Sequence, residues 1–149
     1  NTKNVHRSNF LLGHPYGKDF AYDEMVMTTI GDAGKAIAES IAAALKSANP
    51  FGEGPQPKPG EGPSAEEREA GFYDILFIGE YPDGKSVRAS VKGDRDPGYG
   101  STSKMIAESA LTLLETDSPG GVVTPGAIIA EPLIKRLQAH AGLVFTIEG

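Results

Sequence analysis

Two β-strand patterns joined by one tight turn constrain the fold of this 149-residue sequence more than any other feature. Residues 72–81 are rich in aromatic and branched side chains, and residues 85–92 alternate between apolar and polar side chains. Pro82, Asp83 and Gly84 lie between them and turn the chain. The pattern predicts a β-hairpin whose apolar face must be covered by further elements.

The clearest amphipathic helix is predicted over 31–48. Its apolar residues Ile37, Ile41 and Leu45 recur at four-residue spacing, with alanines between them. Asp32 stands where the N-cap of such a helix belongs.

Two more helices are predicted in the C-terminal half, over 102–115 and 125–140. Thr124 and Pro125 fit the N-cap and first position of the second one, and Gly142 follows its end.

The remaining patterns are shorter. We expect strands over 20–28 and 143–147 and a short helix over 5–12. About four strands would then mix with three main helices, which favours an α+β fold or a mixed α/β sheet layered with helices. The length of 1–149 corresponds to one domain.

Residues 50–63 are dense in proline and glycine and contain one large apolar residue, Phe51. Such a segment buries too little surface to order itself, so we expect an exposed, mobile insertion within the single domain. Ser64 and Glu67 follow it with the spacing of a capping box.

Charge and composition exclude several classes of function. A formal net charge of −6 without a basic tract argues against a nucleic-acid partner. The chain has no cysteine, no metal-ligand spacing of histidines, no apolar run long enough for a membrane span and no signal-peptide pattern. We therefore expect no metal and a cytoplasmic location. The absence of an initiator methionine predicts a piece of a longer protein.

The loop over 93–104 leads into the helix at 102–115 and contains three glycines among charged residues. Glycines let a backbone approach a ligand closely, and a helix start offers free N–H groups. A polar or anionic ligand is one interpretation, and a plain strand-to-helix connection is the other.

A second polar cluster lies in the first helix-like segment and the turn after it. Its variety of hydrogen-bonding groups suits substrate contact, although a polar surface helix would have the same composition. The residues are Asn4, His6, Arg7, Ser8, Asn9, His14 and Tyr16.

Three stretches, in the order in which they occur, resemble the C-terminal part of saccharopine-dehydrogenase-like oxidoreductases, including the trans-acting enoyl reductase type. They are 1–9 with 12–17, 93–110, and 120–125 with 133–137 and 141–143. The resemblance covers nearly the whole chain except the proline- and glycine-rich insertion.

This resemblance implies an enzyme that binds NAD(P) in an N-terminal Rossmann domain, upstream of Asn1, and transfers hydride to or from a carbonyl, imine or enoyl substrate. The present chain would be the substrate-side domain and would hold no cofactor of its own. It would face a small-molecule substrate and the missing Rossmann domain, and its sheet would form a homodimer contact.

The resemblance also orders the candidate residues by role. Tyr16 and Tyr99 are the candidate catalytic proton donors to a carbonyl oxygen, and Arg7 could clamp a carboxylate or carbonyl. The substrate-binding candidates are Arg7, Asn9, His14, Asp96 and Ser101.

Two other interpretations stay open. One is a non-catalytic dimerisation or interaction domain on the same scaffold, and the other is an unrelated small α+β ligand-binding module. A polar, concave surface around Arg7 and Tyr99 would favour the substrate domain over an interaction domain.

Overall fold

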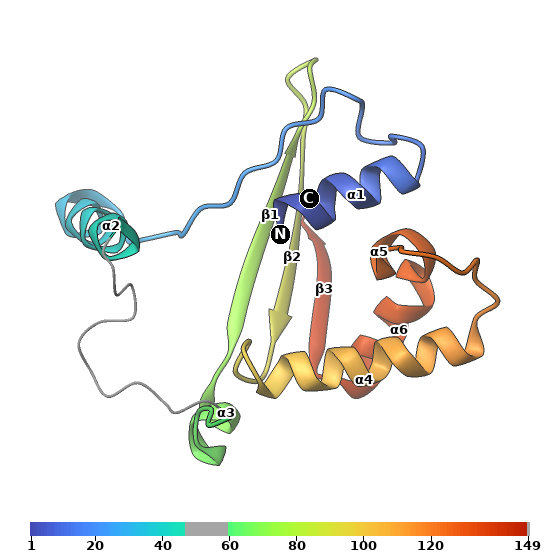
Figure 1. The fold of residues 1–149 in the computed structure, drawn as a ribbon. Helices are drawn as coiled ribbons and strands as arrows, with labels where there is room; N and C mark the ends of the chain where they lie inside the picture. Colours follow the sequence, from blue (N-terminus) through green and yellow to red (C-terminus); the bar gives the residue numbers. More distant parts are fainter. Residues whose placement is uncertain (47–59, 149) are drawn as a thin grey trace.

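The computed structural model describes residues 1–46 and 60–148 (Figure 1). Its elements in chain order are α1 (Thr2–Leu11), α2 (Gly31–Lys46), α3 (Ala65–Ala70), β1 (Tyr73–Glu80), β2 (Ser86–Gly93), α4 (Gly100–Glu115), α5 (Pro125–Ile128), α6 (Ala130–His140) and β3 (Leu143–Glu148). The predicted α+β fold is confirmed. Residues 50–59 of the predicted insertion lie outside the described residues, and 60–62 form an exposed loop.

The sheet has three antiparallel strands in the order β1-β2-β3. The predicted hairpin is confirmed, with Tyr73 opposite Gly93 and Glu80 opposite Ser86. Val91 in the central strand pairs with Phe145 of β3 and Ile75 of β1, so these three side chains share one face of the sheet.

Helices α4 and α6 cover one end of that face (Figure 1). The centre of the core is formed by side chains from α6 and the start of β3, with further apolar residues from α4 and the sheet around them. These residues are Leu137, Ala141, Leu143, Val91, Met105, Leu133 and Phe145. At the other end of the same face, Phe77, Val87 and Ile147 remain exposed. The described helices therefore cover only part of the sheet.

The segment between α1 and α2 differs from the sequence prediction. The strand expected over 20–28 is wrong, because these residues are extended but pair with no strand of the described sheet. Met25, Val26 and Met27 are exposed. Alternation alone does not make a strand when no neighbour satisfies its backbone hydrogen bonds.

Helix α2 follows this segment and lies apart from the sheet and the other helices (Figure 1). The predicted helix over 31–48 is confirmed as far as Lys46, the last described residue before the gap. Asp32 lies within the first turn, since the helix begins at Gly31 with a φ of 82°. An acidic residue in the first turn still stabilises the helix, because its negative charge lies near the positive end of the helix dipole.

The single helix expected over 125–140 is also wrong, because it is broken into α5 and α6 at Ile129. Pro132 explains the break, since a proline has no N–H for the carbonyl of Ile128 and its ring would clash with that carbonyl in a continuous helix. Ile129 leaves helical geometry with φ −134° and ψ 22°, and it is 1% exposed. At this break, the Ile129 side chain is buried in the interior of the protein.

Two predicted end signals are confirmed. The Ser64 hydroxyl accepts a hydrogen bond from the Glu67 amide at 3.2 Å, and the Glu67 carboxylate accepts one from the Ser64 amide at 2.7 Å. These hydrogen bonds lower the pKa of Glu67. Gly142 follows α6 with a φ of 72°, as a glycine at a helix end commonly does.

Candidate functional site

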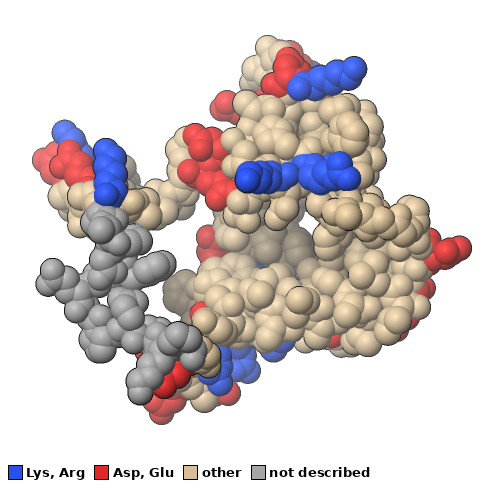
Figure 2. Space-filling model, in the orientation of Figure 1, with Lys and Arg blue, Asp and Glu red and all other residues tan. Residues whose placement is uncertain are grey.

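A concave region lies between α1 and the segment that leads into α5. A cavity of about 380 Å³ is lined there by residues of both, and the surface is hollowed between α1 above and α4 below (Figure 2). Its lining residues are Asn1, Asn4, Val5, Ser8, Val123, Thr124, Pro125 and Gly126. This volume is in the range of small-molecule sites.

A second cavity of about 310 Å³ adjoins the first and shares Val123 and Pro125 with it. Leu113, Ile128 and Ile129 give it a more apolar lining, and Gly120 and Gly121 contribute open backbone. The first cavity is lined by polar and apolar residues together, and the second mainly by apolar ones.

Side-chain hydrogen bonds hold α1 against this segment. The hydroxyls of Ser8 and Thr124 lie 2.7 Å apart, and Arg7 Nη2 donates to the Val122 carbonyl at 3.0 Å. Thr124 precedes α5, as the sequence predicts, but its hydroxyl bonds Ser8 and makes no capping hydrogen bond. The sequence cluster identified Ser8 and Asn4, whereas nothing in it indicated that Thr124 would meet them.

Arg7 is exposed, and its guanidinium also lies 5.5 Å from the centroid of the Phe10 ring. One of its nitrogens is engaged by Val122, which fixes the side chain along the edge of the groove. The remaining donors of the guanidinium have no partner among the described residues, so they are available to a carbonyl or carboxylate.

Asn9 bonds two other predicted site residues, His14 and Tyr16. It is 3% exposed, its Nδ2 donates to the Gly17 carbonyl at 2.8 Å, and its Oδ1 accepts from the Tyr16 amide at 3.1 Å. Its own carbonyl accepts from the His14 amide at 2.7 Å. Asn9 therefore fixes the turn that carries His14 and Tyr16, and a direct contact of Asn9 with substrate stays a prediction.

His14 has a φ of 64°, which is unusual for a residue other than glycine. Its ring contacts Phe10 edge-on at 5.7 Å between centroids. The sequence marked His14 as a site residue but gave no sign of this backbone strain, which the buried Asn9 holds in place.

Tyr16 presents its phenol to solvent at one end of this turn. The ring lies 5.3 Å from that of Phe20, which in turn contacts His6. Its hydroxyl makes no hydrogen bond within the described part of the chain. A positioned tyrosine with a free hydroxyl can donate a proton or a hydrogen bond to a substrate oxygen.

In the loop before α4, the Asp96 carboxylate binds the backbone amides at the start of the helix. The Asp96 carboxylate accepts hydrogen bonds from the amides of Tyr99 and Gly100, each at 2.7 Å, and of Gly98 at 3.1 Å. These bonds, that of Gly100 first, lower the pKa of Asp96. The amides that could have received an anionic ligand are thus occupied, which favours the interpretation of this loop as a connection.

Ser101 is fully buried, and its hydroxyl lies 2.8 Å from the phenol oxygen of Tyr73 in β1. Tyr73 in turn explains the glycine at Gly93, where any side chain would overlap the Tyr73 ring. Ser101 therefore ties α4 to the sheet, and its role in binding substrate stays a prediction.

Tyr99 is exposed, and its ring packs over Gly62. The structure keeps Asp96, Tyr99 and Ser101 together at the start of α4, and Asn9, His14 and Tyr16 together at the end of α1. The start of α4 lies at the end of the sheet away from α1 (Figure 1). The two groups of candidates do not form one site within the described residues.

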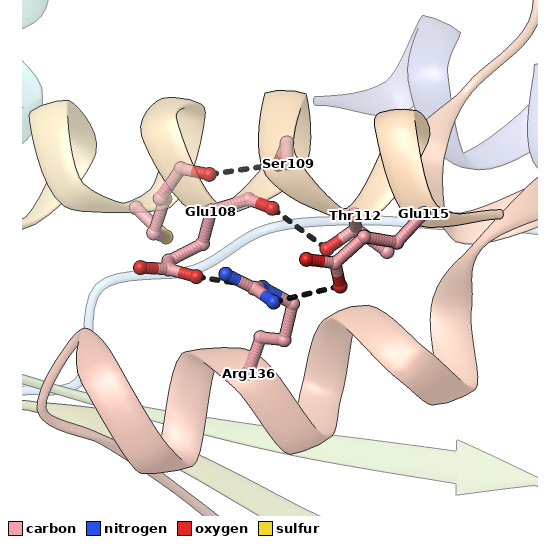
Figure 3. A network of polar contacts seen from close by, with 6 residues as sticks. Glu108, Ser109, Thr112, Glu115 and Arg136 are labelled. Carbon is pink, nitrogen blue, oxygen red and sulfur yellow. Dashed lines mark hydrogen bonds and ion pairs between the residues drawn. The ribbon is translucent and has the colours of Figure 1, made fainter.

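The ion-pair network between α4 and α6 was not foreseen from sequence (Figure 3). Arg136 donates to Glu108 at 2.8 Å and to Glu115 at 2.9 Å, and the Thr112 hydroxyl bonds the Glu108 carbonyl. The single guanidinium of Arg136 thus pairs with two carboxylates and joins the two helices. We interpret the network as structural.

No group of histidine and acidic side chains in residues 1–46 and 60–148 has the arrangement of a metal site. Within the same ranges, no helix has the length and apolar character to cross a bilayer.

Known proteins support a relationship to reductases. A Mycobacterium tuberculosis protein provisionally named a trans-acting enoyl reductase is 34% identical over an alignment of 157 positions, gaps included, that covers 93% of this chain and 37% of that protein. A trans-acting enoyl reductase of Mycobacterium ulcerans is 34% identical over 92% of the chain and 36% of its own length, and one of Mycobacterium bovis is 33% identical over 97% and 38%. The chain thus spans little more than a third of these relatives. No family model and no solved structure matches it.

Proposed function

We propose that this chain forms the substrate-side part of a reductase acting on an enoyl compound. The premise is that the chain is homologous to part of the trans-acting enoyl reductases. The observation that carries the proposal is similarity over 92–93% of the chain to proteins more than twice as long. The saccharopine-dehydrogenase-like scaffold and the use of NAD(P) belong to the same proposal.

The nucleotide would be held outside this chain. Parallel βαβ units with a glycine-rich turn hold the pyrophosphate of a dinucleotide, and the described residues form an antiparallel sheet without such a unit. The described residues therefore do not fit NAD(P), and we assign them no contact with it.

We place the substrate in the groove beside α1. The polar groups of Asn4, Ser8 and Thr124 in the first cavity suit a carbonyl group, and the second cavity, beside Leu113 and Ile128, suits a hydrocarbon chain. Arg7, which reaches Val122 at the edge of the groove, would orient the carbonyl. Tyr16 lines neither cavity, and we keep it as the candidate proton donor because its hydroxyl has no partner among the described residues. Asn9 acts as a positioning residue through its hold on the Tyr16 turn.

The test uses this chain as part of a protein of the relatives' length, with NADPH or NADH oxidation and a set of enoyl thioesters as substrates. Tyr16→Phe is expected to lower kcat at least about tenfold, since a general acid contributes that much or more. Tyr81→Phe removes the hydroxyl of a similarly exposed tyrosine at the hairpin turn and serves as the matched control.

Tyr99→Phe distinguishes the two candidate regions. If this variant loses activity and Tyr16→Phe keeps it, the reacting group binds at the start of α4 instead. Full activity in both would refute the assignment of a catalytic tyrosine to this chain.

A non-catalytic interaction domain on the same scaffold is the second candidate. The exposed apolar residues Phe77, Val87 and Ile147 on the sheet favour it, because such a surface marks a contact with another protein part. Absence of NAD(P)H binding, measured by fluorescence, in both the 149-residue chain and the longer protein would support this alternative.

A further inference from the structure

Residues 18–46 form an arm, consisting of the extended segment 18–30 and helix α2 (Figure 1). The extended segment exposes Met25, Met27 and Ile30, the last of which is 97% exposed. As long as nothing covers these side chains, they stay in contact with water and contribute no hydrophobic free energy to folding.

Helix α2 has the pattern of a helix that packs against something. Ile37, Ile41 and Leu45 lie on one face, while Lys35 and Lys46 lie on the opposite face at helical spacing. Ile37 and Leu45 are nonetheless exposed, and the helix lies apart from the rest of the described chain (Figure 1). A helix of this length owes most of its stability to packing of its apolar face.

The total surface of the chain leads to the same conclusion. It measures 11389 Å², for a mass of 15.6 kDa. A compact monomer of this mass exposes about 7,200 Å². The surface of this chain is thus larger than that of a compact monomer of the same mass.

The relatives indicate which part of a longer protein could cover the exposed apolar side chains of the arm. They match 92–97% of this chain, so the arm lies within the region of similarity, yet this region makes up only 36–38% of their length. The larger part of such a protein is therefore available to contact the arm.

The composition of the extended segment agrees with this source. Residues 25–31 of the arm carry no charge, which suits an apolar protein surface.

We propose that the arm, residues 18–46, is the docking element through which this chain holds the remaining part of a longer polypeptide, with the apolar face of α2 and the side chains of 25–30 buried in the contact. This inference rests on the proposed function for the identity of the remaining part as the nucleotide-binding half. The arm would thereby fix the substrate groove relative to the bound nucleotide.

Hydrogen–deuterium exchange of the α2 amides tests the proposal directly. We expect rapid exchange in the 149-residue chain and exchange at least about tenfold slower in the protein of the relatives' length, independent of protein concentration. Rapid exchange in both proteins would overturn the proposal. Slow exchange in the 149-residue chain that depends on its concentration would also overturn it, because a second copy would then cover the arm.

Paired substitutions in the longer protein identify the contacting face. Ile37→Gln with Leu45→Gln should restore rapid exchange of α2, whereas Lys35→Gln with Lys46→Gln should leave it slow. Equal exchange in the two double variants would refute docking through the apolar face. Circular dichroism of the same variants in the longer protein checks that the rest of the fold is intact.

The exchange readout separates this proposal from the proposed function. A longer protein with a protected α2 but no reductase activity refutes the function and keeps the docking. An active reductase with an unprotected α2 refutes the docking and keeps the function.

Discussion

The two halves of this molecule use apolar residues in opposite ways. In the C-terminal half, Ile129 and Leu137 are buried, Leu137 in the core beside the sheet, and Arg136 links α4 to α6. In the arm, Ile30 and Leu45 are exposed although they belong to equally apolar patterns. The same residue types thus stabilise one half within this chain and leave the other dependent on a contact elsewhere.

This difference separates self-sufficient structure from structure that needs a partner. The network in Figure 3 and the core around Ala141 satisfy polar and apolar groups locally. The arm and the uncovered end of the sheet, around Phe77 and Ile147, do not. We therefore expect substitutions to alter the stability of the 149-residue chain in the C-terminal half but not in the arm.

Matched isoleucine substitutions give the largest expected contrast. Ile129→Ala should lower the free energy of unfolding by about 3 kcal/mol, since it removes a fully buried side chain and leaves a cavity. Ile30→Ala removes the same atoms from a 97% exposed position and should leave stability unchanged. Urea denaturation measures both, and equal losses would show that the arm packs within the 149-residue chain.

An intermediate effect is expected from the ion pairs of α6. Arg136→Met leaves Glu108, whose side chain is 14% exposed, without its cation and should cost about 1–2 kcal/mol. Lys135→Met, next in sequence, breaks an exposed pair with Glu131 and should have no measurable effect. Urea denaturation of the two variants measures both effects. An unchanged free energy of unfolding in Arg136→Met would mean that the network contributes nothing to joining the helices.

The smallest expected effect is a pH dependence at the start of α4. The amides of Gly100, Tyr99 and Gly98 lower the pKa of Asp96 from its ordinary 3.8 in the folded protein. The stability that its carboxylate contributes is therefore present above pH 3.8 and is lost as the pH falls through the lowered pKa.

Asp96→Asn should thus lower the thermal midpoint at neutral pH, and the difference from the unchanged protein should shrink as the pH falls below 3.8. Asp117→Asn removes the same charge from an exposed position after α4 and controls for net charge. A difference between Asp96→Asn and the unchanged protein that is constant with pH would contradict the assigned hydrogen bonds.

Local patterns in the sequence predicted much of the fold. The hairpin, the capping box at Ser64 and the end of α6 at Gly142 follow from residues close to one another in the chain. The broken helix was missed although its signal, Pro132, was present in the sequence. The strand over 20–28 was predicted from alternation, which cannot show whether a neighbouring strand exists.

The candidate site was predictable only in part. The sequence identified Arg7, Asn9 and Tyr16 as a polar cluster, but it could not show that Asn9 is buried and fixes the Tyr16 turn. Asp96 was selected for its chemistry, and its hydrogen bonds to the helix start became visible only with the backbone in place.

By itself, the sequence determined the local elements, because turn residues, caps and hydrophobic spacing act over a few positions of the chain. Only the tertiary structure decided that Thr124 meets Ser8, that Arg136 joins α4 to α6 and that the arm finds no cover within the described chain. These outcomes depend on residues far apart in sequence, whose proximity is set by the packing of whole elements and not by any local pattern.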